Sequence, residues 1–234
     1  MASLQTTYTY ALLPPDAMLV LPEGIAGALQ RIPVGSLDAL VEVGLDIETL
    51  QSDDARLMRA VLHHDQVIRE AFEQTDLLPL RFGTCFRSQT DLENHLQDNA
   101  DAYLAKLAKV KGKAEYTVRL KPVVASASAI PAEAGGKAYF LAKKRQFQEQ
   151  FEQQQQRQQQ RDVLREAIAQ IYPHLFTAEP RDGMERLYFL ADFSRGNGLA
   201  EPPQSPQGYL EQWQALCPLW EVMLDAPLPP YHFV

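Results

Sequence analysis

A thiol and two imidazoles are the side chains in this sequence that could perform nucleophilic catalysis if the fold brought them together. His63 and His64 are neighbours in the sequence, and Cys85 follows in the next apolar stretch. A thiol beside an imidazole base is the arrangement of a nucleophilic catalyst. The alternative is structural, because neighbouring helical positions point about 100° apart and share one ligand poorly. We expect His64 to face the core and His63 the polar side, and we keep a small-molecule-binding or cysteine-dependent enzyme using Cys85 and His64 as the alternative function.

A carboxylate pair and one guanidinium are the other reactive groups at notable positions. Asp53-Asp54 lies where a helix is expected to begin, and carboxylates there favour the positive end of the helix dipole, so we interpret both as helix-start residues. Arg81 lies among large apolar side chains. It could hold an anion, but we prefer an ion pair with a helix carboxylate such as Glu70 or Glu73, because a guanidinium in apolar surroundings needs a partner.

Composition and motifs exclude several classes of function. The sequence contains no nucleotide-binding, zinc-protease or serine-hydrolase motif, and Cys85 and Cys217 match no metal spacing, so we expect neither cofactor nor metal. We expect both cysteines to pack as small hydrophobic side chains. The net charge of −8 opposes binding to nucleic acid or to an anionic lipid membrane. With neither a signal peptide nor an apolar span of about 18 residues, the chain reads as cytoplasmic.

The stretch that should organise the fold is Leu77–Phe86, LLPLRFGTCF. Its density of large apolar side chains predicts a strand buried on both faces. Pro79 cannot donate to a sheet ladder, so it should lie at an edge, a strand start or a bulge. Gly83 provides a bend or a close backbone approach. The predicted structural core motif consists of Pro79, Leu80, Arg81, Phe82 and Gly83.

Around this stretch, periodicity predicts a compact N-terminal α/β domain over residues 1–112. Thr6–Leu13 and Leu37–Val43 alternate as strands do, and residues 14–35 are predicted to form a loop with one short helix. A helix capped by Ser52 should lead into Leu77–Phe86.

The last predicted element of this domain is a second helix. Thr90 and Glu93 have the spacing of a capping box and should open it, and Gly112 should end it.

Residues 113–234 are predicted to form a second domain with the order strand, helix, strand, helix, strand. Glu115–Lys121 should be half-exposed, whereas Leu187–Phe193 should be buried and Leu219–Leu224 should form the last strand. Ser205 followed by proline marks a helix start. This order is typical of a ferredoxin-like sandwich with a missing or altered strand. The predicted loops are Ala125–Gly136 and Arg195–Pro206, and a proline-rich tail with Tyr231 and Phe233 as anchors ends the domain.

One long helix is predicted from Lys137 to Tyr172, with a glutamine-rich middle. At 1.5 Å per residue it would be on the order of 50 Å long, which exceeds a small domain, so the glutamine-rich middle should protrude or end in a bent hairpin. Its polar middle could be a solvated face. Alternatively, the helix is a partner-binding arm that uses Phe147, Phe151 and Leu164, since an apolar stripe longer than its domain must be covered by something.

Three segments together resemble one known family: PLRFG within Leu77–Phe86, EYTVRLKP from Glu115, and the terminal PPYHFV. The chain resembles the gas vesicle protein family GvpF/GvpL over essentially its whole length. It departs from the family at residues 226–230, APLPP, where members commonly carry Gly-Pro-Trp before the final prolines. The resemblance implies an α+β protein with an N-terminal α/β domain and a modified ferredoxin-like C-terminal domain.

The resemblance also implies a function. Members are minor, shell-associated proteins that contact the hydrophobic major gas vesicle shell protein and other minor vesicle proteins during nucleation. A shell subunit with a strongly apolar face would aggregate before it polymerises, so an accessory protein could cover that face. The expected role is gas vesicle assembly at the vesicle in the cytoplasm, and not enzymatic catalysis.

Overall fold

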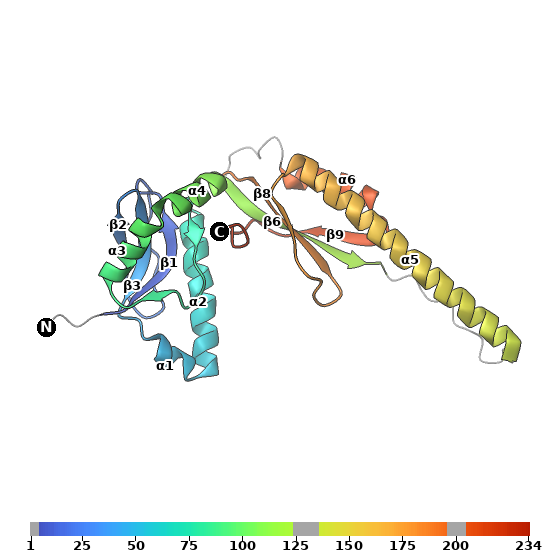
Figure 1. Ribbon diagram of the computed structural model, residues 1–234, viewed down its shortest axis with the longest axis horizontal. Helices are drawn as coiled ribbons and strands as arrows, with labels where there is room; N and C mark the ends of the chain where they lie inside the picture. Colours follow the sequence, from blue (N-terminus) through green and yellow to red (C-terminus); the bar gives the residue numbers. More distant parts are fainter. Residues whose placement is uncertain (1–4, 124–135, 196–204) are drawn as a thin grey trace. The chain divides into compact units, whose positions relative to one another are not determined.

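The computed structural model of this 234-residue chain describes residues 5–123, 136–195 and 205–234 (Figure 1). The chain forms two compact units that interleave along the sequence. Unit 1 contains Met1–Glu115, Leu190–Pro203 and Pro227–Val234, and unit 2 contains Tyr116–Phe189 and Gln204–Ala226. The predicted domains, residues 1–112 and 113–234, are each continuous, whereas both units consist of separate stretches of the chain. The boundary between residues 112 and 113 stays a prediction. The predicted loops Ala125–Gly136 and Arg195–Pro206 lie almost wholly outside the described residues.

Unit 1 is a sheet with helices. Its elements are β1 (Thr7–Leu13), β2 (Leu29–Val34), β3 (Leu37–Val43), α1 (Ile47–Gln51), α2 (Asp54–Phe72), β4 (Leu78–Pro79), β5 (Cys85–Phe86), α3 (Gln89–Asp98) and α4 (Ala100–Val110). The strand order is β2-β3-β1-β4, with β5 also paired to β1, and the pairs are antiparallel. The strands predicted at Thr6–Leu13 and Leu37–Val43 are therefore present as β1 and β3.

The prediction of a loop and helix over residues 14–35 is wrong for its last part, because β2 forms there and pairs with β3. The sequence did not predict β2 because Pro33 cannot donate a ladder hydrogen bond. β2 lies at the edge of the sheet, where a proline is tolerated.

The prediction of one buried strand over Leu77–Phe86 is also wrong. Leu77 and Leu78 are buried, but the stretch forms two short strands paired with β1, β4 and β5, with a turn between them. Gly83 has φ of +88°, and Thr84 N donates to Arg81 O across the turn at 3.1 Å. Arg81 is exposed, and no ion pair among the described residues includes it, so the predicted pair with Glu70 or Glu73 is wrong.

The two helix starts predicted in unit 1 are each displaced by one or two residues from their predicted positions. Asp53, not Ser52, caps α2 by accepting a hydrogen bond from Arg56 N. Ser88, not Thr90, caps α3 by accepting one from Asp91 N. The helix predicted after this cap is two helices, because α3 ends before Asn99 and α4 begins after it.

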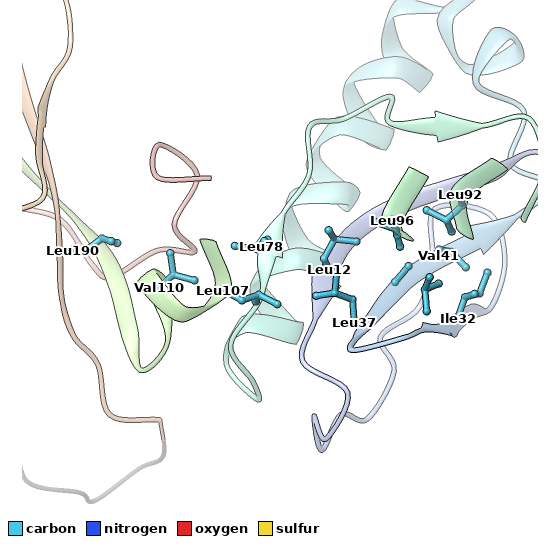
Figure 2. Close-up of a cluster of buried hydrophobic side chains, with 12 residues drawn as sticks. Leu12, Ile32, Leu37, Val41, Leu78, Leu92, Leu96, Leu107, Val110 and Leu190 are labelled. Carbon is cyan, nitrogen blue, oxygen red and sulfur yellow. The ribbon is translucent and has the colours of Figure 1, made fainter. Parts of the chain in front are cut away.

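The core of unit 1 collects side chains from the sheet, from α3 and α4, and from later stretches of the chain (Figure 2). Leu190 is 3% exposed and belongs to this cluster, and Phe233 packs against it. The cluster consists of Leu12, Ile32, Val34, Leu37, Ala39, Val41, Leu78, Leu92, Leu96, Leu107, Val110 and Leu190.

Unit 2 contains the second sheet, with strand order β7-β8-β6-β9. Its elements, some of which extend into unit 1, are β6 (Lys113–Pro122), α5 (Gly136–Ile171), β7 (Leu175–Thr177), β8 (Glu185–Asp192), η1 (Pro206–Tyr209), α6 (Leu210–Leu216) and β9 (Trp220–Leu224). β7 was not predicted from the sequence. With it the element order becomes β-α-β-β-α-β, and the ferredoxin-like description stays a prediction.

Aromatic side chains fill the centre of unit 2. Trp213 is 1% exposed and lies edge-on to Phe189, with ring centroids 5.9 Å apart. Leu164 and Ile168 of α5 are fully buried as well. The prediction of a half-exposed strand at Glu115–Lys121 is wrong for its polar side, since Thr117 is buried. The fold class, α+β with two sheets, is confirmed.

Candidate functional site

The PLRFG segment lies against a buried group of aromatic rings and one imidazole. Phe82 meets Tyr8 and His64 edge-on, with centroid separations of 6.1 and 5.6 Å. Gly83 N donates to Tyr8 Oη at 3.3 Å, and Leu80 N donates to Tyr10 O at 2.9 Å. Pro79 pairs with β1 at Ala11. The segment therefore connects β1 to α2 through its backbone and through Phe82, while the guanidinium of Arg81 points to no partner among these residues.

His64 uses both ring nitrogens within this group. Its Nδ1 lies 2.8 Å from Tyr8 Oη, and its Nε2 lies 3.1 Å from Leu80 O. A carbonyl can only accept, so Nε2 carries the proton and Nδ1 accepts from the phenol. The ring also stacks on Tyr10 at 5.2 Å. Burial lowers the pKa of His64 and raises the pKa of Tyr8, so all of these groups stay neutral near pH 7.

Glu42 of β3 is a buried carboxylate beside this group, and it was not among the residues predicted to be functional. It is 2% exposed and accepts from Tyr10 Oη at 2.6 Å, from Ile25 N at 2.8 Å and from Ala26 N at 2.8 Å. A Cβ at Gly24 would lie 2.5 Å from its Oε2, so only glycine fits there. Glu42 thus fixes the loop before β2. Glu42 lies on the opposite face of the strand from Leu37, Ala39 and Val41, so alternation did not predict its burial, and no feature of the sequence predicted its hydrogen-bond partners.

The geometry contradicts a catalytic pair of Cys85 and His64. Both nitrogens of His64 have other partners, and Cys85 Sγ contacts the backbone oxygen of Phe86 at 3.7 Å. An activated thiol has a lowered pKa, whereas desolvation raises the pKa of Cys85. Cys85 is also exposed, so the expectation that it packs as a buried hydrophobic side chain is wrong, while Cys217 is buried as expected.

A thiol titration should therefore count one reactive cysteine in the folded protein. We expect an aromatic disulfide reagent at pH 8 to label Cys85 slowly and to leave Cys217 unlabelled, because Cys217 is fully buried and its pKa is raised to about 11. In urea both should react. The matched variant C85S should release no thiolate signal until it unfolds. Rapid labelling of Cys85 that H64Q abolishes would contradict the structural role of His64.

The C-terminal tail is anchored on unit 1 by side chains from three positions. His232 donates from its backbone N to Glu115 Oε2 at 2.8 Å, and its Nδ1 lies 2.7 Å from Oε1. Tyr231 Oη donates to Asp65 Oδ1 of α2 at 2.5 Å. Phe233 lies under Lys109, with Nζ 5.5 Å from the ring centroid. Tyr231 and Phe233 are thus anchors as predicted. The role of Glu115, only 1% exposed on a strand expected to be half-exposed, was missed.

The N-terminal half of α5 presents apolar side chains to solvent. Figure 1 shows this end of the helix extending past the strands of unit 2. Phe140, Phe147 and Phe151 are 74%, 65% and 61% exposed. Going along α5 from its N-terminus, Arg157 is the first described residue that forms a hydrogen bond with another part of unit 2. Its carbonyl accepts from Trp220 Nε1 at 3.0 Å, and its side chain donates to Val123 O at 2.8 Å.

Of the three residues predicted to bind a partner, two are accessible. Phe147 and Phe151 lie on the exposed half of α5, whereas Leu164 is fully buried in unit 2. Leu164 therefore cannot belong to the same exposed surface. It lies past Arg157, where the helix packs on its own sheet and the apolar stripe has a partner within the chain.

No candidate metal or membrane segment is present in the described part of the chain. Among residues 5–123, 136–195 and 205–234, histidines, cysteines and carboxylates form no group of three that could hold a metal ion. Within the same ranges, every helix is too short or too polar to span a bilayer.

The sequence matches the family model of the gas vesicle synthesis protein GvpL/GvpF over residues 6–234. A relative in Halobacterium salinarum, gas vesicle protein F1, is 29% identical over 121 residues, which cover 50% of this chain and 54% of that protein. The match thus spans about half the length of the curated relative.

Two solved structures have the same fold. The gas vesicle protein GvpF from Anabaena sp. PCC7120 superposes with a TM-score of 0.67 at 14% identity, covering 98% of this chain and 95% of that one. GvpF from Microcystis aeruginosa gives 0.65 at 16% identity, covering 97% and 98%. With a family model matched over nearly the whole sequence and this fold described above, the chain belongs to the GvpL/GvpF family of gas vesicle synthesis proteins.

Proposed function

We propose that this chain is a gas vesicle assembly accessory protein. It is a minor vesicle component that binds the hydrophobic major shell protein, and other minor vesicle proteins, during nucleation. The binding keeps the shell protein from aggregating before it polymerises. Family membership supports a role connected with gas vesicles. The single observation that supports a holdase mechanism is the exposed apolar surface on the N-terminal half of α5, at Phe140, Phe147 and Phe151.

The physical reason is that water-exposed phenylalanine is costly unless a partner covers it. Removing apolar surface from water contributes about 25 cal/mol per Å². A partner that fully covers one such ring therefore gains roughly 1.5–3 kcal/mol of binding free energy. These rings stand on a helix, so a second apolar polypeptide could cover several of them at once. The Cys85–His64 enzyme has no comparable support, because its two side chains are engaged elsewhere.

Co-expression with the major shell protein tests the proposal. The wild-type chain should raise the soluble fraction of the shell protein, and F147S/F151S should lose most of that effect. Phe176 is 47% exposed on β7, so F176S is a matched control that should behave like wild type. Sedimentation at matched expression levels provides the readout. If the wild-type chain leaves soluble yield and sedimentation unchanged, the holdase mechanism is wrong.

The same material can test where the protein resides. A minor vesicle component should float with intact vesicles and be detected in the washed fraction, whereas a factor needed only for nucleation should remain in the cytoplasmic supernatant. The role in assembly would be contradicted by two results together: the protein is found in neither the washed vesicles nor the supernatant of vesicle-producing cells, and cells that lack the protein form normal vesicles.

A further inference from the structure

Four side chains on the exposed half of α5 recur at heptad spacing. They follow one another at intervals of four, three and four residues, and we term them the α5 seam: Phe140, Lys144, Phe147 and Phe151. At about 100° per residue they lie within an arc of about 60° on one side of the helix. All four are exposed, on the part of α5 that extends past the strands of unit 2 (Figure 1). A row of residues with this spacing is the surface that one helix presents to another helix in a coiled coil.

The α5 seam contains a lysine between its phenylalanine rings. Lys144 lies one turn from both Phe140 and Phe147, so a partner that covers those rings also covers the lysine side chain. Lys143 flanks the seam, and its Nζ lies 5.8 Å from the ring centroid of Tyr139. Within the described residues, no ion pair includes either lysine. Covering an ammonium group without giving it a carboxylate partner is strongly unfavourable, so an entirely apolar partner fits this seam poorly.

The carboxylates on this half of α5 lie on the wrong side of the helix to pair with Lys144 of a second copy. Glu149 and Glu152 are about 140° or more around the helix from Phe147, on the side that carries Arg145. A second α5, parallel or antiparallel, would therefore bring further lysines and no carboxylate to the seam. Because a symmetric dimer interface must be complementary to itself, this arrangement argues against a second copy as the occupant.

We propose that the α5 seam binds a helix of another polypeptide whose own apolar stripe contains a carboxylate opposite Lys144. The phenylalanine rings supply the contact area. The ion pair selects the partner and fixes its register, as a single polar residue does inside a coiled coil. This inference rests on the proposed function, because it uses the same surface of α5, and it adds the chemistry by which the partner is recognised. Lys144 is the residue that determines specificity.

Three synthetic helices that differ at one position test the proposal on the full-length protein. Each is about 20 residues long, with an apolar stripe at heptad spacing and glutamate, leucine or lysine at the central position of the stripe. Wild type should bind the glutamate peptide about tenfold or more tightly than the leucine peptide by fluorescence anisotropy, because close charge pairs at interfaces contribute at least this factor. It should bind the lysine peptide most weakly. K144E should prefer the lysine peptide, and K144L should prefer the leucine peptide.

R145E is the matched control for K144E. It makes the same change of charge on the opposite side of the helix, so it should keep the wild-type order of the three peptides. Far-UV circular dichroism checks that each variant is folded. The proposal would be overturned if wild type bound the glutamate and leucine peptides equally or bound neither, or if R145E changed the order. It would also be overturned by a wild-type dimer in sedimentation velocity that F147S/F151S dissolved, because the occupant would then be a second copy.

The peptide experiment and the co-expression experiment can fail separately. If the peptides bind in the expected order but the soluble yield of the shell protein does not change, the seam recognises a helix with a carboxylate and the holdase mechanism is wrong. If the yield rises and F147S/F151S removes the effect, but the peptides are not distinguished, the surface binds through apolar contact alone. The specificity assigned to Lys144 would then be wrong.

Discussion

W213A should destabilise unit 2 by about 3–5 kcal/mol, which is the usual cost of deleting a fully buried tryptophan side chain. Trp213 is 1% exposed and packs face-to-face with Tyr209, with centroids 5.9 Å apart, and edge-on with Phe189. Alanine leaves a cavity among rigid aromatic rings that cannot collapse into it. Trp220 remains in unit 2, so its fluorescence in a urea titration reports the unfolding of that unit.

The control for this experiment is F176A. Phe176 is 47% exposed on β7, so its truncation should shift the urea midpoint only slightly. A W213A midpoint within the range of F176A would mean that the aromatic side chains of α6 do not form the core of unit 2.

E42A should have the second largest effect, a loss of about 1–3 kcal/mol in unit 1. Removing the carboxylate leaves the buried Tyr10 Oη without its acceptor, and one buried unsatisfied donor costs about 1–3 kcal/mol. The Ala26 amide also loses its acceptor, whereas the Ile25 amide keeps only Tyr10 Oη, at 3.1 Å. Hydrogen exchange at the Ile25 and Ala26 amides is the most direct measurement, since their protection should fall first. A fall in the urea midpoint by circular dichroism should accompany it.

Glu48 provides the comparison for this variant. It is an exposed carboxylate in the first turn of α1, so E48A removes the same charge without exposing a buried donor. If protection at Ile25 and Ala26 falls equally in E42A and E48A, the effect is electrostatic and the hydrogen bonds described here do not hold the loop.

Most elements could be predicted from the spacing of their apolar residues. In a half-buried strand or helix, the apolar residues recur with the period of that element. β3 was predicted at its observed bounds, Leu37–Val43. The misses have local causes. Pro33 concealed β2, whose place at the edge of the sheet no local signal reveals. For Leu77–Phe86, the many apolar side chains led to the prediction of one continuous strand. The turn at Gly83 was missed, although the sequence contained the glycine and proline that interrupt the strand.

The candidate sites were less predictable than the fold because they depend on residues distant in sequence. His64 was correctly placed on the buried side of α2, but its partners, Tyr8 and Leu80, come from two other segments. Leu164 and Phe151 look alike in a helical pattern, and only the packing of α5 on its sheet distinguishes the buried residue from the exposed one.

The interleaving of the two units has a consequence for how the protein is made. Leu190 and Phe233 complete the packing of a core whose other members lie within the first 110 residues. A ribosome adds roughly 5–20 residues per second, so the earliest strands wait roughly 10–40 seconds for these contributions. We therefore expect the nascent N-terminal half to remain incompletely packed until synthesis is nearly finished, and chaperones to encounter it during that interval.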